Sequence, residues 1–88
     1  MVAVVPSLEC SLADLPVGIP ARVAAMDREA AQRLGVHGFR LGAALRIERD
    51  APFHGPRIVC LGGARIAVAA AIARSVRVRL EAEATPRP

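Results

Sequence analysis

Short alternations of apolar and polar residues recur along most of the chain. Residues 43–49 (AALRIER) and 76–80 (VRVRL) both alternate apolar with charged side chains. A period of two predicts a strand with one buried face. Three further strands are predicted at 21–26, at 57–61, whose apolar run indicates cover on both faces, and at 65–68.

Helical patterns occupy only two short segments. Asp27 is a suitable N-cap for a helix over residues 28–34, whose narrow apolar stripe faces one side. Gly35 or Gly38 is placed to end that helix in a left-handed conformation. The alanine-rich residues 69–75 predict one further helical turn.

The order strand, helix, three strands, helical turn, strand predicts a mostly β fold. About five antiparallel strands in a small, partly open barrel would bury one apolar interior and hide most strand edges. We expect an N-terminal tail at 1–11, one domain at 12–80 and a C-terminal tail at 81–88.

The composition and the N-terminal residues indicate the cellular compartment of the protein. The chain has 88 residues, 53% of them hydrophobic, and its longest apolar run covers residues 66–73. That run is too short to cross a bilayer, which needs about 20 residues. Residues 1–10 have no basic region followed by a long apolar one, so we expect no signal peptide and a cytoplasmic protein.

The net charge of +4 comes from arginine, because all twelve basic residues are Arg. A basic surface suggests an acidic partner, a nucleic acid or a membrane face, and the alternative is a solvated arginine-rich surface. Arg46, Arg77 and Arg79 alternate on strands and are candidates for a basic groove. Only two aromatic residues, Phe39 and Phe53, are present to stack on bases.

Few residues suggest chemistry. Cys10 and Cys60 are expected as free thiols, with Cys60 a small buried hydrophobe in its strand. No pair of ligands has the spacing of a known metal motif, so we expect no resident cofactor. The weak candidates for contact with Fe²⁺ are Glu48, Asp50 and His54, whose alternative is a solvated strand and loop. No nucleophile has a base beside it, so an enzyme is not predicted.

Four segments of the chain resemble the FeoA family in order and spacing. They are LADLPVGIPARVAAMD (12–27), GFRLG (38–42), IERDAPFHGP (47–56) and ARIAVAAAIARSVRVRL (64–80). The loops depart from the family pattern. Leu41 stands where proline is usual, and His54 and Gly55 stand where glycine and aspartate are usual.

The resemblance implies an SH3-like barrel and an accessory role in bacterial ferrous iron uptake. The implied partner is FeoB, a membrane permease with a cytosolic GTPase domain, which would bring the protein to the inner membrane. Two alternatives stay open. One is an interaction module related to the C-terminal domain of metal-dependent repressors, and the other is a small basic barrel that binds nucleic acid.

Two loops are the predicted contact surface. We expect the loops 38–42 and 51–56 to be neighbours, with Phe53 and His54 at or beside the contact and no chemistry in His54 itself. Phe39 is expected as a plug at the end of the barrel, with a place in the contact as its alternative, and for Phe53 both interpretations stay open. The candidate residues are Gly38, Phe39, Leu41, Gly42, Pro52, Phe53, His54, Gly55 and Pro56.

Overall fold

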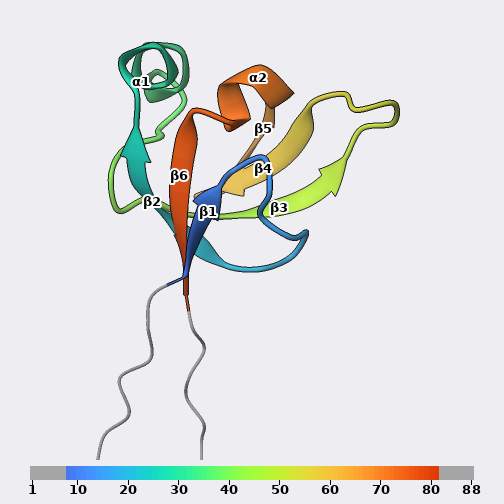
Figure 1. Cartoon of the computed structure of the whole chain (residues 1–88), viewed down its shortest axis with the longest axis horizontal. Helices are drawn as coiled ribbons and strands as arrows, with labels where there is room; N and C mark the ends of the chain where they lie inside the picture. Colours follow the sequence, from blue (N-terminus) through green and yellow to red (C-terminus); the bar gives the residue numbers. More distant parts are fainter. Residues whose placement is uncertain (1–7, 82–88) are drawn as a thin grey trace, which may run out of the picture.

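The computed structural model describes residues 8–81 as six strands and two short helices (Figure 1). The elements in chain order are β1 (Glu9–Ser11), β2 (Ala21–Met26), α1 (Arg28–Gly35), β3 (Ala44–Asp50), β4 (Arg57–Leu61), β5 (Ala64–Val68), α2 (Ala70–Ala73) and β6 (Val76–Leu80). The predicted mostly β architecture is confirmed, with six strands rather than about five. Most of the two predicted tails, residues 1–7 and 82–88, lies outside the described residues.

All six strands form one antiparallel sheet in the order β1-β6-β2-β3-β4-β5. The sheet is open, because β1 and β5 lie at its two edges. β1 falls inside the predicted N-terminal tail, yet Glu9 pairs with Arg79 and Cys10 with Val78. The tail prediction is therefore wrong for these residues, whose short mixed pattern ECS carries no clear alternation.

Alternation along the strands builds the core. On β6, Val76 and Val78 are fully buried while Arg77 and Arg79 are exposed, as the pattern predicts. The same rule buries one face of β2, β3 and β4. The fully enclosed large side chains are Leu12, Leu15, Ile47, Val59, Val68, Val76 and Val78.

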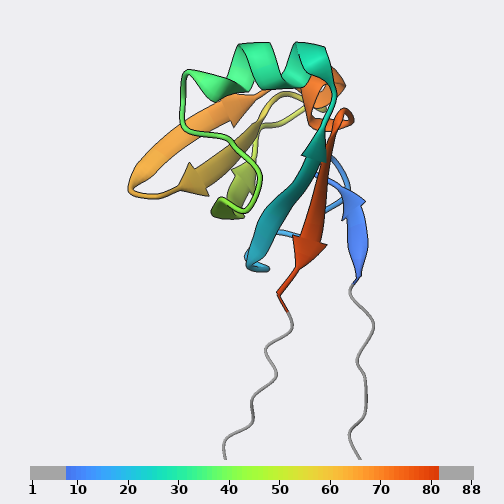
Figure 2. The same cartoon turned by 90° about the vertical axis from the view of Figure 1, so that its left-hand side faces the viewer.

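The helix α1 begins and ends for local reasons. The carboxylate of Asp27 accepts a hydrogen bond from the N–H of Ala30 at 2.8 Å, so the predicted N-cap is confirmed. Gly38 then turns the chain away at φ +99°. A Cβ at that glycine would lie 3.1 Å from Leu61 Cδ2, so the position also has little room for a side chain. Ala30 and Leu34 are the buried residues of the helix, which lies across one end of the sheet (Figure 2).

The strand β4 is less buried than its composition suggests. Val59 and Leu61 point into the core, whereas Ile58 and Cys60 are only half-buried on the outer face. The prediction of cover on both faces, with Cys60 as a buried hydrophobe, is therefore wrong. β4 lies between β3 and β5 in the sheet, and no element covers its outer side among residues 8–81.

Arg57 joins the two ends of the open sheet. Its side chain is only 13% exposed and forms a fork on Asp50 of β3, with Nε 2.6 Å from Oδ1. Its Nη1 donates to the carbonyls of Leu12 and Ala13, directly after β1, at 2.8 and 3.0 Å. Since β1 is one edge and β4 lies next to the other, this arginine links the two sides of the open sheet.

None of the described helices combines the length and the apolar character needed to span a membrane.

Replacing Arg57 tests this link. Arg57→Ala leaves two carbonyls and a carboxylate without their donor, so we expect the free energy of unfolding to fall by about 2–4 kcal/mol. Arg57→Lys keeps the charge but cannot form the fork, and we expect a smaller loss. Urea unfolding of the three proteins measures this, and equal stability of the wild type and Arg57→Ala would contradict the link.

Candidate functional site

The loop 51–56 is a tight turn between β3 and β4. The N–H of Gly55 donates to the carbonyl of Pro52 at 3.1 Å, and the N–H of Ala51 donates to Pro56 at 3.0 Å. Between them, Phe53 and His54 have φ values of +60° and +59°. Two successive left-handed residues are the arrangement of a type I′ turn, which usually contains asparagine and glycine.

Phe53 is presented to solvent at the tip of this turn. Its side chain is 96% exposed, the highest value among the exposed large hydrophobic residues. A left-handed conformation costs an L-residue about 1–2 kcal/mol, and a bulky residue adopts it rarely. Strain of this kind persists where the surrounding structure enforces it, and it is often found at functional sites. The positive φ of His54 fits the resembled pattern, in which glycine is usual at this position.

The loop 38–42 presents a different residue from the one expected. Phe39 is 2% exposed and packs in the core, so it is the plug and is removed from the predicted contact surface. Gly38 and Gly42 turn the chain at positive φ on either side of it. Leu41 is 66% exposed and is the apolar side chain that this loop offers to solvent.

The two loops are not neighbours, which corrects the prediction. The loop 38–42 precedes β3 and the loop 51–56 follows it, so they lie at opposite ends of that strand (Figure 1). Seven residues of strand span about 20 Å at roughly 3.3 Å per residue. The loops are therefore two separate surfaces.

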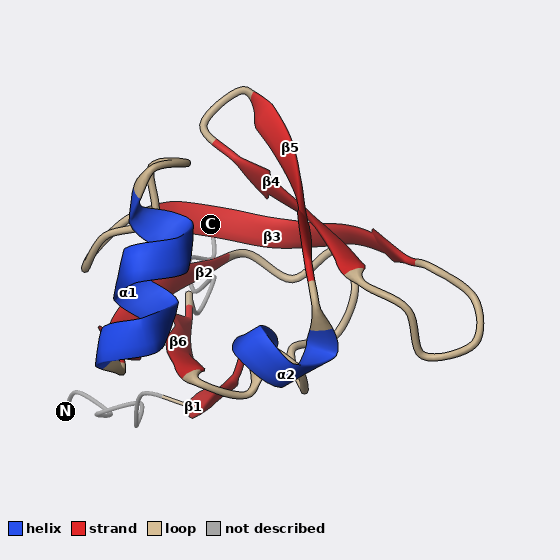
Figure 3. Ribbon diagram, turned by 90° about the horizontal axis from the view of Figure 1, so that it is seen from above, coloured by secondary structure: helices blue, strands red, loops and turns tan. Residues whose placement is uncertain are grey.

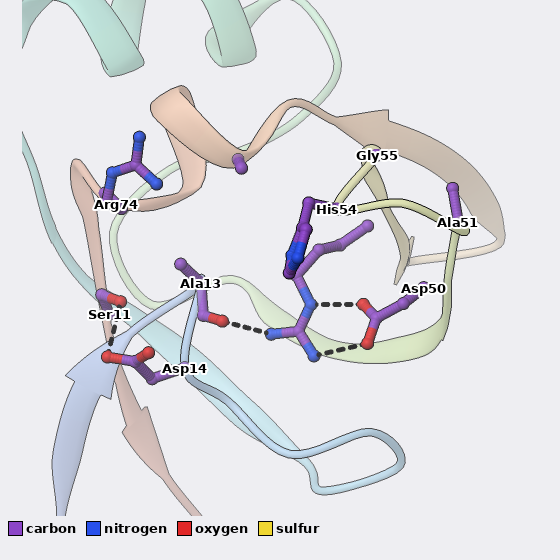
Figure 4. Close-up of a pocket in the computed structure, with 10 residues that line it drawn as sticks. Ser11, Ala13, Asp14, Asp50, Ala51, His54, Gly55 and Arg74 are labelled. Carbon is purple, nitrogen blue, oxygen red and sulfur yellow. Dashed lines mark hydrogen bonds and ion pairs between the residues drawn. The ribbon is translucent and has the colours of Figure 1, made fainter.

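A cleft of about 560 Å³ opens beside the loop 51–56 (Figure 4). Its walls come from the segment after β1, from the β3–β4 hairpin and from the end of α2. His54 and Arg74 lie on different sides of it, and Asp14, which accepts a hydrogen bond from Ser11 Oγ at 3.3 Å, also lines it. The cleft thus carries side chains of both charge signs beside the exposed Phe53.

The three weak metal candidates are not brought together. Glu48 is 2.6 Å from Arg65 Nε, and Asp50 is held by Arg57, so both carboxylates already have cationic partners. Within residues 8–81, no cluster of three or more His, Cys, Asp or Glu side chains has the geometry to hold a metal ion. Burial and then the Asp14 charge raise the pKa of the Cys10 thiol, which keeps it in the form that binds metals poorly.

Cys60 instead belongs to a small polar group on the outer face. Its Sγ lies 3.3 Å from Glu48 Oε1, the oxygen that also accepts from Arg65. The hydrogen bond from Cys60, followed by that from Arg65, lowers the pKa of Glu48 below its ordinary value of 4.5. This carboxylate therefore stays charged down to acidic pH.

The candidate basic groove is interrupted by acids. Arg77 and Arg79 lie 3.8 and 3.0 Å from the carboxylate of Glu9, which partly neutralises both. Arg46 lies on β3, which β2 separates from β6 in the sheet. The predicted row of three arginines along one groove is therefore not formed.

A comparison with models of protein families gives a match over most of the chain. The model of the FeoA domain matches residues 10–80. The chain belongs to the FeoA family. The match begins within β1, so the family domain includes the strand that the sequence analysis placed in a tail. A comparison with curated protein sequences gave no match.

Solved FeoA structures share the fold. FeoA from Chlorobium tepidum has 26% identity and a TM-score of 0.75, with 85% of this chain and 73% of that chain covered. Stenotrophomonas maltophilia FeoA, described as a procaryotic SH3 domain protein and complexed with zinc, has 30% identity and a TM-score of 0.66, with 77% and 87% covered. The SH3-like fold is thus confirmed.

The same fold occurs in a manganese-dependent transcriptional repressor. The similarity has 20% identity and a TM-score of 0.75 and covers 89% of this chain but only 45% of the repressor. At that identity the likeness concerns the fold alone. It shows that part of this repressor has the same fold.

Replacing His54 by glycine tests the strain in the turn. His54→Gly removes a left-handed side chain, and we expect the free energy of unfolding to rise by up to about 1 kcal/mol. The matched control is His37→Gly, because His37 is also exposed but has no positive φ. Thermal unfolding of both variants measures this, and destabilisation by His54→Gly equal to that of the control would argue against strain.

The group around Glu48 predicts a pH dependence. Because its pKa is lower in the folded than in the unfolded chain, its stabilising effect is present above pH 4.5 and is lost as pH falls through the folded pKa. We expect Glu48→Gln to be less stable than wild type at neutral pH and equal to it well below pH 4.5. Urea unfolding at the two pH values measures this, and a constant difference would rule out the mechanism.

Proposed function

We propose that this FeoA-family chain is a non-enzymatic accessory of ferrous iron uptake that binds the cytosolic part of the FeoB permease through the tip of the loop 51–56. The observation that carries the proposal is the exposed Phe53 on a strained turn. Family membership indicates the iron-transport context, and the turn offers the surface. In this account the protein works in the cytoplasm and reaches the inner membrane only through its partner.

The physical gain from docking comes from covering one aromatic ring. Burying a phenylalanine side chain that is 96% exposed is worth about 1.5–3 kcal/mol. The two hydrogen bonds across the turn already hold the loop in shape. A preformed loop loses little conformational entropy on binding, so more of that gain remains as affinity.

Docking also supplies a way to modulate transport. A partner with open and closed states shifts toward whichever state binds this chain more tightly. Three kcal/mol of preference for one state changes the ratio of the two states by about two orders of magnitude. The mixed charges of the adjacent cleft, with Arg74 and Asp14 on its walls, favour a contact that is apolar at Phe53 and polar around it.

Two exposed apolar residues provide the test. We expect Phe53→Ala to weaken binding of the purified cytosolic domain of FeoB by about tenfold or more, measured by calorimetry. Leu41→Ala is the matched control, since Leu41 is also exposed but lies at the other end of β3. It is expected to change the affinity by less than about twofold.

Neither substitution removes a core contact, so both variants should fold as the wild type does. Iron uptake by cells that carry each variant gives the second readout, and we expect it to fall for Phe53→Ala alone. Wild-type affinity and wild-type uptake in the Phe53→Ala cells would refute the proposed contact. A loss with Leu41→Ala instead would move the contact to the loop 38–42.

A further inference from the structure

The outer edge of β5 is a row of open backbone groups. β5 ends the sheet and pairs with β4 alone among the described residues. Ala64, Arg65 and Ala67 are exposed there, and the β4–β5 hairpin projects past β3 (Figure 3). An edge of this kind is a template on which another extended chain can pair.

The register identifies the open groups. β4 and β5 are joined by two residues, with Leu61 opposite Ala64. A hairpin with a two-residue turn closes on a hydrogen-bonded pair, and such pairs alternate with non-hydrogen-bonded ones along the ladder. Arg65 and Ala67 therefore point their N–H and C=O groups away from β4, toward the free side.

β5 lacks two of the usual protections of an edge strand, a proline and a bulge. Edge strands are commonly protected by proline, by bulges or by charged side chains that lean over the edge. β5 (ARIAV) has no proline, and its pairing with β4 has no register shift, unlike the pairing of β3 with β4. Its one charged residue, Arg65, pairs with Glu48 of β3, with Nε 2.6 Å from Oε1, and its side chain stays 71% exposed.

The outer face beside this edge carries two arginines, Arg46 and Arg65, and one acid, Glu48. Arg46, Cys60 and Arg65 lie opposite one another across three strands and line a groove of about 570 Å³. No acid of residues 8–81 pairs with Arg46 within 4.0 Å, whereas Arg65 has Glu48. A strand added beside β5 would extend this row outward and place its own side chain opposite Arg65. Opposite charges in that position stabilise strand pairing.

The inner side of the β5 edge favours an apolar side chain from a bound strand. Ile66 faces the core beside Val59, which is fully buried, but is itself only half-buried. The residue of an added strand that follows the acidic one would point to this same side. An occupant that alternates acidic and apolar residues therefore fits both faces.

We propose that the β5 edge binds an extended acidic segment of a partner protein by strand addition, with an acidic side chain opposite Arg65 and an apolar one beside Ile66. This site is separate from the loop 51–56 and does not depend on the proposed docking to FeoB. Main-chain hydrogen bonds to Arg65 and Ala67 would supply affinity, and the charge of Arg65 would select an acidic sequence.

A capped peptide that alternates glutamate and valine is the probe, and its lysine–valine twin is the control. With the full-length protein, we expect the acidic peptide to slow amide exchange at Arg65 and Ala67 by about tenfold or more, while the lysine peptide has no effect. Unchanged exchange at both amides with millimolar acidic peptide would overturn the proposal. Equal protection by the lysine peptide, or protection that rises with protein concentration alone, would also overturn it.

Two substitutions sharpen the test. Ala67→Pro removes one outward N–H at an edge position that tolerates proline, and we expect it to abolish binding. Arg65→Gln removes the cation opposite the added strand, and the exposed ion pair with Glu48 that it also removes contributes little to stability. We expect this variant to lose the preference for the acidic over the lysine peptide. Should Ala67→Pro not fold, an unchanged preference of Arg65→Gln for the acidic peptide still refutes the inferred charge selection.

Discussion

The hydrogen bonds that Arg57 donates across the open side of the sheet, while Asp50 holds its guanidinium in place, are the constraint on which the other features depend. A six-stranded sheet of this length has two edges and a core of aliphatic side chains with one phenylalanine. Arg57 satisfies two carbonyls after β1 and both oxygens of Asp50, and so holds one edge against the base of the β3–β4 hairpin. The turn at Phe53 is presented from that base, so the stability of the barrel and the shape of the candidate contact have a common origin.

Regular patterns in the sequence predicted most of the fold. Alternation in β3 and β6 and the cap at Asp27 are local signals, and each has the structural outcome that its physics implies. The missed strand β1 has only three residues and pairs with a strand almost seventy positions away, so no local pattern marks it. The link from Arg57 to Leu12 was missed for the same reason, because its acceptors are backbone carbonyls of a distant segment.

The candidate site was predicted less well than the fold. Exposure of Phe53 and burial of Phe39 depend on which way each loop turns, and the sequence analysis left both residues with two interpretations. The two loops were expected to be neighbours, but a seven-residue strand separates them. The sequence did indicate the strained turn at one position. His54 stands where the FeoA pattern usually has glycine, and a position that favours glycine is one where a positive φ is expected.

The central claim is that the loop 51–56 is the surface through which this FeoA-family chain meets FeoB. An amide NMR titration of the labelled wild-type chain with the cytosolic domain of FeoB tests it most directly, because every loop is observed in one experiment. The account predicts shifts concentrated at Ala51, Phe53, His54 and Gly55, with Leu41 and Gly42 unaffected. Shifts that cluster elsewhere, or no shifts at saturating partner concentration, would contradict it.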